Sequence, residues 1–270
     1  MIISEEHRFV FVHIPKCAGS SVRKRLNRFN EWQVTGPPWI QMDGPSYGHI
    51  PLFVLREHFT REFEAVQDYW SFAVVRDPFE RFASSVSQRL SEFGDQPIQN
   101  LSPKKIRSFI HKTIEYLSQH QQMRGLLPPD YIHFQRQLDY IELNGERIID
   151  SIYTIDQIDE LFADVERKTG QKLVGATGQG KSTHVRQTIV YRSDLFRRVI
   201  ENSRPITNYL SKVLPESTKQ SIRDRVYVQR DKRLKGIFEE IYVQAFIRDY
   251  YSDDIALYKS HLKTAHSEVP

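Results

Sequence analysis

A short segment near the start of the chain combines the residue types that bind phosphate or sulfate groups. It holds one lysine, three small residues and two serines in direct succession: Lys16, Cys17, Ala18, Gly19, Ser20 and Ser21. The lysine supplies a positive charge, and the serines supply hydroxyl donors. If a helix follows such a loop, the unpaired N–H groups of its first turn also point at the ligand. The segment therefore predicts an anion-binding loop.

The residues on either side of this loop predict the elements that would position it. Phe9 to Ile14 is apolar, β-branched and aromatic, and Pro15 closes the run, which is typical of a short buried strand. Beyond the loop, Val22, Leu26 and Phe29 are spaced as on one face of a helix. The loop is thus expected between a core strand and a helix.

A second strand and helix carry another pair of polar residues. Tyr69 to Val75 predicts a buried strand, which runs directly into Arg76. Pro78 suits the first turn of a helix whose apolar face contains Phe79, Phe82, Ala83 and Val86. Arg76 is therefore expected at the carboxyl end of a strand, where open α/β sheets bind ligands, and Ser84 on the following helix.

The remaining pattern alternates between strands and helices. A third core strand is expected over Ile148 to Tyr153, and helices over Ser102 to Gln122, from Ile155 to near Gly170, and from Leu234 to about Tyr251. A tail running from Asp253 to Tyr258 should follow the last helix. This alternation predicts an α/β fold with three layers and a central, mostly parallel sheet. We expect residues 1–270 to form a single domain.

The lysine loop resembles the 5′-phosphosulfate loop of sulfotransferases, in particular the carbohydrate type that includes heparan sulfate 2-O-sulfotransferase. In that family the loop typically reads Pro-Lys-Thr followed by small and hydroxyl residues, and Cys17 replaces the usual threonine here. The resemblance implies a P-loop-like sulfotransferase fold and 3′-phosphoadenylyl sulfate (PAPS) as donor. It also implies adenosine 3′,5′-bisphosphate (PAP) as product and no metal. Residues 16 to 21 would hold the 5′-phosphosulfate, with Lys16 neutralising the leaving phosphate oxygen.

Two further residues gain a role from the same resemblance. Arg76 and Ser84, eight residues apart, are similar to the pair that holds the 3′-phosphate of the donor in these enzymes. Residues 30 to 48 are rich in Gly, Pro, Trp and Gln and predict a substrate-shaping loop. His49 follows Gly48 where the carbohydrate sulfotransferases carry their catalytic base. With the ordinary histidine pKa near ~6.5, the reaction rate should fall as the pH drops through that value.

Composition sets broader limits on the protein. The chain has 270 residues, 39% hydrophobic residues and a single cysteine, so it is long enough for a sizeable core but cannot form an internal disulfide. No window approaches the ~20 apolar residues of a membrane helix. We therefore expect a soluble cytoplasmic enzyme without a nucleic-acid partner, acting on a hydroxyl-bearing acceptor, with carbohydrate as the class that the resemblance implies.

Three other interpretations remain open on the sequence alone. Gly175 to Ser182 matches the Walker A pattern of nucleotide-hydrolysing domains. That pattern requires a buried strand before it, but only two apolar residues, Leu173 and Val174, precede it here. Cys17 and Arg23 match the Cys-x5-Arg loop of tyrosine phosphatases, with Asp77 as general acid, but Lys24 stands where those enzymes place Ser or Thr. Residues 181 to 235 hold 14 Lys and Arg against 5 Asp and Glu, which fits a non-catalytic binder of anionic polymers.

Overall fold

A four-stranded sheet forms the centre of the computed structural model. The structure describes residues 1–32, 49–94, 100–121, 125–173, 190–191, 227–228 and 236–267. The strands of the sheet are β1 (Ile2–Ser4), β2 (Phe9–Val12), β3 (Trp70–Val75) and β6 (Ser151–Thr154). Their order is β1-β2-β3-β6, with β1 antiparallel to β2 and the other neighbours parallel. The expected mostly parallel sheet is confirmed.

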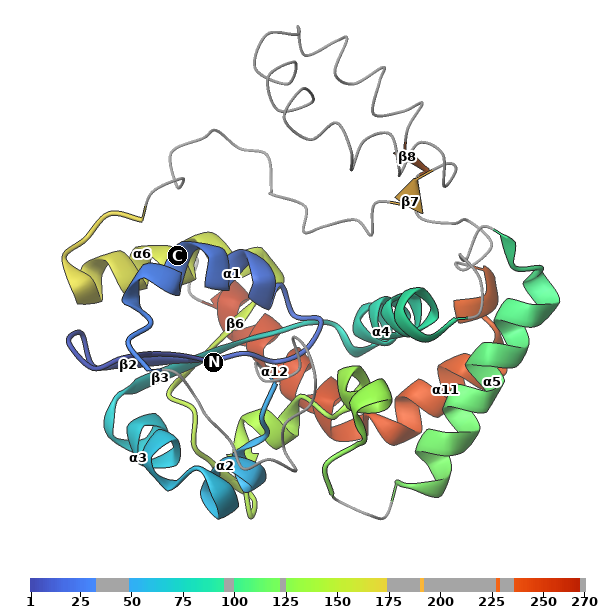
Figure 1. The fold of residues 1–270 in the computed structure, drawn as a ribbon, viewed down its shortest axis with the longest axis horizontal. Coiled ribbons are helices and arrows are strands. Elements are labelled where there is room, and N and C mark those ends of the chain that lie inside the picture. The colour runs from blue at the N-terminus through green and yellow to red at the C-terminus, as the bar shows by residue number, and fades with distance from the viewer. Residues whose placement is uncertain are drawn as a thin grey trace, which may run out of the picture.

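Helices cover both faces of this sheet, as Figure 1 shows. One face packs on α1 (Gly19–Leu26) and α6 (Ile158–Thr169), and the other on α2 (Leu52–His58) and α3 (Thr60–Asp68). Successive strand residues point to opposite faces. In β3, Phe72 and Val74 accordingly join the first core, whereas Ala73 and Val75 join the second. The predicted three layers are therefore present around the sheet.

A second group of helices lies beside the sheet (Figure 1). It contains α4 (Pro78–Phe93), α5 (Pro103–Gln119), α11 (Ile241–Tyr250) and the 3-10 helix η4 (Pro129–Phe134). The helices α4 and α5 each begin with a proline in the first turn and a capping side chain. Asp77 accepts from the N–H groups of Phe79 and Glu80, and Ser102 accepts from that of Lys105. Phe82, Val86, Ile110, Phe134 and Val243 share the core of this group.

The C-terminal region differs from the expected tail. Residues from Ser252 onward form the helix α12 (Ser252–Ser267), with Asp253 and Asp254 in its first turn, where acidic side chains are favourable. The expected third strand is also shifted. It begins at Ser151 because the N–H groups of Ile148 and Ile149 bond to Ile141, at the base of a small hairpin. The first correction replaces a tail by a helix, and the second moves the start of a strand. Two further helices, α2 and α3, were not expected.

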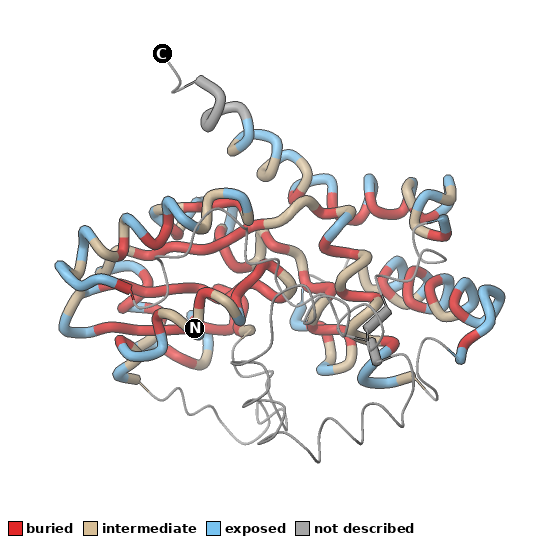
Figure 2. Tube along the Cα trace, turned by 90° about the horizontal axis from the view of Figure 1, so that it is seen from above, coloured by how far each residue is buried: buried red, intermediate tan, exposed pale blue. Residues whose placement is uncertain are grey.

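The other elements are short. They are the hairpin strands β4 (Glu142–Leu143) and β5 (Glu146–Arg147), the pair β7 (Val190–Tyr191) and β8 (Tyr227–Val228), and the 3-10 helices η1 (Asn27–Phe29), η5 (Leu138–Tyr140) and η6 (Ile155–Gln157). Figure 2 shows that the buried residues run through the sheet and along the inner sides of the helices. Within the described ranges, no helix is long and apolar enough to cross a membrane.

Candidate active site

The lysine loop joins β2 to α1 and has an unusual backbone. Lys16 and Ala18 both have positive φ angles, 64° and 59°. For a residue with a side chain, this left-handed conformation costs roughly 1–2 kcal/mol. Such strain persists only where the surroundings hold it in place. The helix that follows has no capping side chain and no acidic residue in its first turn, so the positive end of its dipole is not neutralised there.

Gly19 is required where this loop enters α1. A Cβ atom at this position would lie 1.8 Å from Cδ2 and Nε2 of His13. The imidazole of His13, the second-last residue before Pro15, therefore packs directly against the loop backbone. The His13 side chain is buried, and its Nδ1 atom has no hydrogen-bond partner within the described part of the chain. The imidazole of His13 thus leaves no space for a side chain at position 19 of the loop.

Lys16 extends from the loop to the helix α4. Its Nζ donates to Oε1 of Gln88 at 3.0 Å, and the Gln88 amide in turn donates to Glu92. Lys16 is half-buried, and burial lowers the pKa of its ammonium group, an effect that the nearby Glu92 carboxylate opposes. The lysine charge is thus partly withdrawn from water, which strengthens its action on a neighbouring anion.

Arg76 lies immediately after β3 and approaches the same loop. Its Nε and Nη2 atoms donate to Oε2 of Glu80 at 3.3 and 3.0 Å, and its Nη1 atom is 3.5 Å from the carbonyl oxygen of Lys16. The Arg76 side chain is mostly buried, whereas that of Glu80 is 62% exposed. The two strand ends expected to bind anions therefore meet in space.

One face of α4 connects these two cations. Residues four apart on a helix lie on the same face, so Glu80, Ser84 and Gln88 form a row. Glu80 binds Arg76 at one end of the row, and Gln88 binds Lys16 at the other. Ser84, which is half-buried, comes between them. The structure thus brings together Lys16, Arg76 and Ser84, which the sequence placed on separate elements.

Three histidines gather beside the lysine loop. His49 lies with its ring centroid 4.3 Å from that of His13 and 5.9 Å from that of His133. Burial lowers the pKa of His49 to about 3 and that of His133 to about 4, and the positive charge of Lys16 adds to the effect on His133. Burial also lowers the pKa of His13, so all three rings are neutral near pH 7. In the free protein, burial thus places the pKa of His49 well below the ordinary value of ~6.5 on which the expected acidic limb was based.

The surroundings of Cys17 do not favour a role as nucleophile. Its side chain is buried, with Sγ 3.2 Å from Oε1 of Gln137 and 3.4 Å from the carbonyl oxygen of Pro15. Burial raises the thiol pKa to about 11, whereas reactive cysteines have lowered values. Asp77, the general acid of the phosphatase interpretation, is engaged in capping α4. These observations argue against a Cys-x5-Arg phosphatase.

The class of the protein follows from its similarity to a known protein family. The model of the sulfotransferase family matches residues 1–259, nearly the whole chain. The chain belongs to the sulfotransferase family. Membership implies a transferase that moves a sulfuryl group to a hydroxyl-bearing acceptor, with PAPS as the donor that the family generally uses. No curated protein and no solved structure matches the chain.

Several residues that surround the candidate site were not found from the sequence. His13, Gln88, His133 and Gln137 carry no local motif, because their partners lie far away in the chain. Arg81 is the clearest case, since it lies outside the apolar face predicted for α4 and is nevertheless only 1% exposed. No feature of the surrounding sequence indicates this burial.

Other expectations fall outside the described residues. These are the Walker-like segment 175–182, the basic stretch 181–235, apart from two residue pairs of known strand geometry, and most of the loop 30–48. No group of three or more His, Cys, Asp or Glu is arranged to hold a metal ion in the described ranges.

A cavity of about 240 Å³ opens near Arg76, between the start of α4 and the helices α11 and α12. Phe79, Arg248, Tyr258 and Lys259 are among its lining residues. Typical small-molecule sites measure ~300–1,000 Å³, so this cavity alone is too small for a nucleotide donor. The row of residues on α4 is therefore the better candidate for the donor site.

Proposed function

We propose that this sulfotransferase moves the sulfuryl group of PAPS to a hydroxyl of a carbohydrate. The loop from Lys16 to Ser21 holds the 5′-phosphosulfate, and Arg76 with Ser84 holds the 3′-phosphate. One observation carries the proposal: Lys16 and Arg76 contact the two ends of a single row of residues on α4, with Ser84 between them. A donor with anionic groups at two positions requires such a pair of cationic sites.

The residues present fit a bisphosphate donor. Lys16 is held by a neutral amide, and Arg76 by an exposed carboxylate, so an anion can replace either partner without breaking the core. The backbone of Cys17, Ala18 and Gly19 leads into an uncapped helix, where Ser20 and Ser21 add hydroxyl groups. The Cys17 side chain is buried, so this residue contributes its backbone only.

Lys16 acts on the leaving group. When bound, the donor supplies an activated sulfuryl group, whose transfer places negative charge on the phosphate oxygen that departs. A fixed positive charge in a partly desolvated site stabilises that oxygen more strongly than water does. Lys16 has this character because it is half-buried and its ammonium is held in place by Gln88.

His49 accepts the proton of the acceptor hydroxyl. Its Nδ1 atom lies 3.1 Å from the carbonyl oxygen of His13. Because a carbonyl can only accept, Nδ1 carries the hydrogen and Nε2 keeps the free lone pair. The low pKa of His49 keeps the ring neutral but makes it a weak base in the free protein. The negative charge of a bound donor would raise that pKa toward the range of an effective base.

The proposal of a carbohydrate acceptor rests on the resemblance of the Gly48-His49 pattern to the carbohydrate sulfotransferases. It is tested by incubating the protein with labelled PAPS and glycans, phenols or small alcohols, and measuring transfer of the label to each. We expect transfer of the label to glycans.

The variant Lys16→Ala tests the role of the lysine in the same assay. It should lower kcat by ~10²- to 10³-fold, as for the loss of other groups that stabilise a developing oxyanion.

The matched control for this assay is Cys17→Ser, which changes the neighbouring residue. Serine preserves the loop, so transfer should stay within a few-fold of the wild-type rate. An inactive Cys17→Ser variant beside an active Lys16→Ala variant would reverse the assignment in favour of a cysteine nucleophile.

A further inference from the structure

The side chain of Gln137 connects the two strand ends of the proposed donor site. Gln137 is fully buried, at 0% exposure, just before η5. Its Nε2 donates to the carbonyl oxygen of Arg76 at 2.9 Å, and its Oε1 accepts from the Arg76 N–H at 2.9 Å. The same Oε1 atom accepts from the thiol of Cys17 at 3.2 Å. The side-chain amide of Gln137 therefore hydrogen-bonds both the N–H and the carbonyl group of Arg76, and it also contacts the lysine loop.

The lysine loop is held on both sides of Lys16. Arg81 donates from Nε to the carbonyl oxygen of Pro15 at 3.0 Å, and Gln137 contacts Cys17. Lys16 between them has the strained positive φ of 64°. These two contacts supply the external restraint that such a conformation requires.

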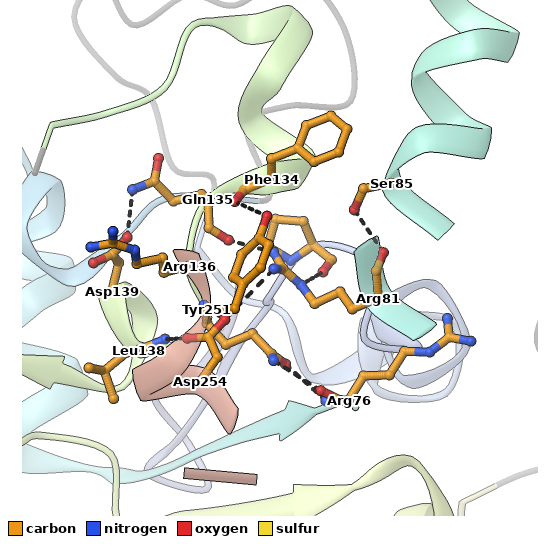
Figure 3. A network of polar contacts seen from close by, with 12 residues as sticks. Arg76, Arg81, Ser85, Phe134, Gln135, Arg136, Leu138, Asp139, Tyr251 and Asp254 are labelled. Carbon is orange, nitrogen blue, oxygen red and sulfur yellow. Dashed lines mark hydrogen bonds and ion pairs between the residues drawn. The ribbon is translucent and has the colours of Figure 1, made fainter. Parts of the chain in front are cut away.

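Gln137 is itself fixed by the C-terminal helix. Asp254, in the first turn of α12, accepts from the N–H groups of Gln137 at 2.9 Å and Leu138 at 3.0 Å. Asp254 is 1% exposed and lies 4.0 Å from Nη1 of Arg81. Figure 3 shows Arg76, Arg81, Leu138 and Asp254 grouped around this point. Asp254 therefore holds the backbone of Gln137 in place.

We propose that Gln137 is a positioning residue that sets the spacing between the 5′- and 3′-phosphate sites, and so the selectivity for nucleotides phosphorylated at both positions. The inference rests on the proposed function. A ligand with two phosphates gains from both sites only when their separation matches its own, because the second contact is then intramolecular. A nucleotide with one phosphate does not depend on that separation. Gln137 touches neither phosphate and acts through the backbone of Arg76 and the side chain of Cys17.

The test compares dissociation constants of PAP and 5′-AMP for the full-length protein by calorimetry. The quantity measured is the selectivity ratio, the 5′-AMP constant divided by the PAP constant. In Gln137→Leu, which removes all three contacts, we expect the ratio to fall at least ~10-fold, mainly through weaker PAP binding. Gln137→Glu keeps both acceptor contacts and loses the donor contact, so its ratio should be intermediate.

Gln135→Leu is the matched control. Gln135 is 4% exposed, and its side chain bonds to Leu127, Gly125 and Asp139, none of which belongs to the two strand ends. This variant should lose thermal stability but keep the wild-type ratio. A folded Gln137 variant with the wild-type ratio would overturn the inference. So would the unfolding of both Gln137 variants while Gln135→Leu folds, because that result indicates a purely structural role. Absence of PAP selectivity in the wild-type protein would instead refute the proposed function.

Discussion

Acidification should destabilise this protein strongly, because the histidines beside the lysine loop are buried in their neutral form. An unfolded histidine binds a proton below its ordinary pKa of ~6.5, whereas folded His133 and His49 do so only below about 4 and about 3. Between these values the unfolded chain binds more protons than the folded one. The stability supplied by the neutral rings is therefore complete above pH ~6.5 and falls progressively as the pH drops.

The size of this effect follows from the two pKa values. A shift of one unit corresponds to ~1.4 kcal/mol, so going from pH 8 to pH 5 costs ~2 kcal/mol for His133 and a similar amount for His49. His13, whose pKa burial also lowers, acts in the same direction. A total of ~4 kcal/mol is a large part of the ~5–15 kcal/mol that stabilises a typical domain.

Urea unfolding followed by circular dichroism at pH 8, 7, 6 and 5 measures this loss. The variant His133→Gln cannot take up a proton and should reduce the loss between pH 8 and pH 5 by ~2 kcal/mol. His261→Gln, on α12 and outside the cluster, is the control and should keep the wild-type pH dependence. A free energy of unfolding that stays constant from pH 8 to pH 5, or the same loss in His133→Gln as in the wild type, would refute the reasoning.

Two substitutions test the roles proposed for the site residues. His49→Ala should lower kcat by ~10²- to 10⁴-fold, as expected for loss of a general base, and leave the affinity for PAP almost unchanged. Near-normal turnover would exclude His49 as the base. Arg76→Ala should remove most of the preference for PAP over 5′-AMP, because the guanidinium makes the charge-assisted bonds to the 3′-phosphate. Arg61→Ala on the surface of α3 should retain that preference, and its loss there would point to a general charge effect instead.

Local sequence patterns were sufficient to predict the strands and helices that carry the two anion-binding motifs. Continuous apolar runs identified β2 and β3, since strands buried on both faces have no polar alternation. Pro78 marked the start of α4 through its fixed φ angle. The helices α2 and α3 were not predicted, although Leu52, Leu55 and Phe59 have helical spacing, because α2 is only 7 residues long and ends just before Phe59.

The contacts that assemble the site could not be predicted in the same way. The bonds from Gln137 to Cys17 and Arg76 join residues 120 and 61 positions apart, and nothing in the residues around Gln137 indicates either partner. His49 was identified through family resemblance, but its low pKa results from burial beside His13 and His133. Such properties depend on the packing of distant segments and are read only from the folded structure.

The central claim is that Lys16 and Arg76 form two anion sites for one nucleotide. The most direct measurement is calorimetric binding of PAP and 5′-AMP to the wild-type protein under identical salt conditions. A hydrogen bond to a charged group contributes ~1.5–3 kcal/mol, so PAP should bind ~10- to 100-fold more tightly than 5′-AMP. Equal affinity for the two nucleotides would contradict the claim.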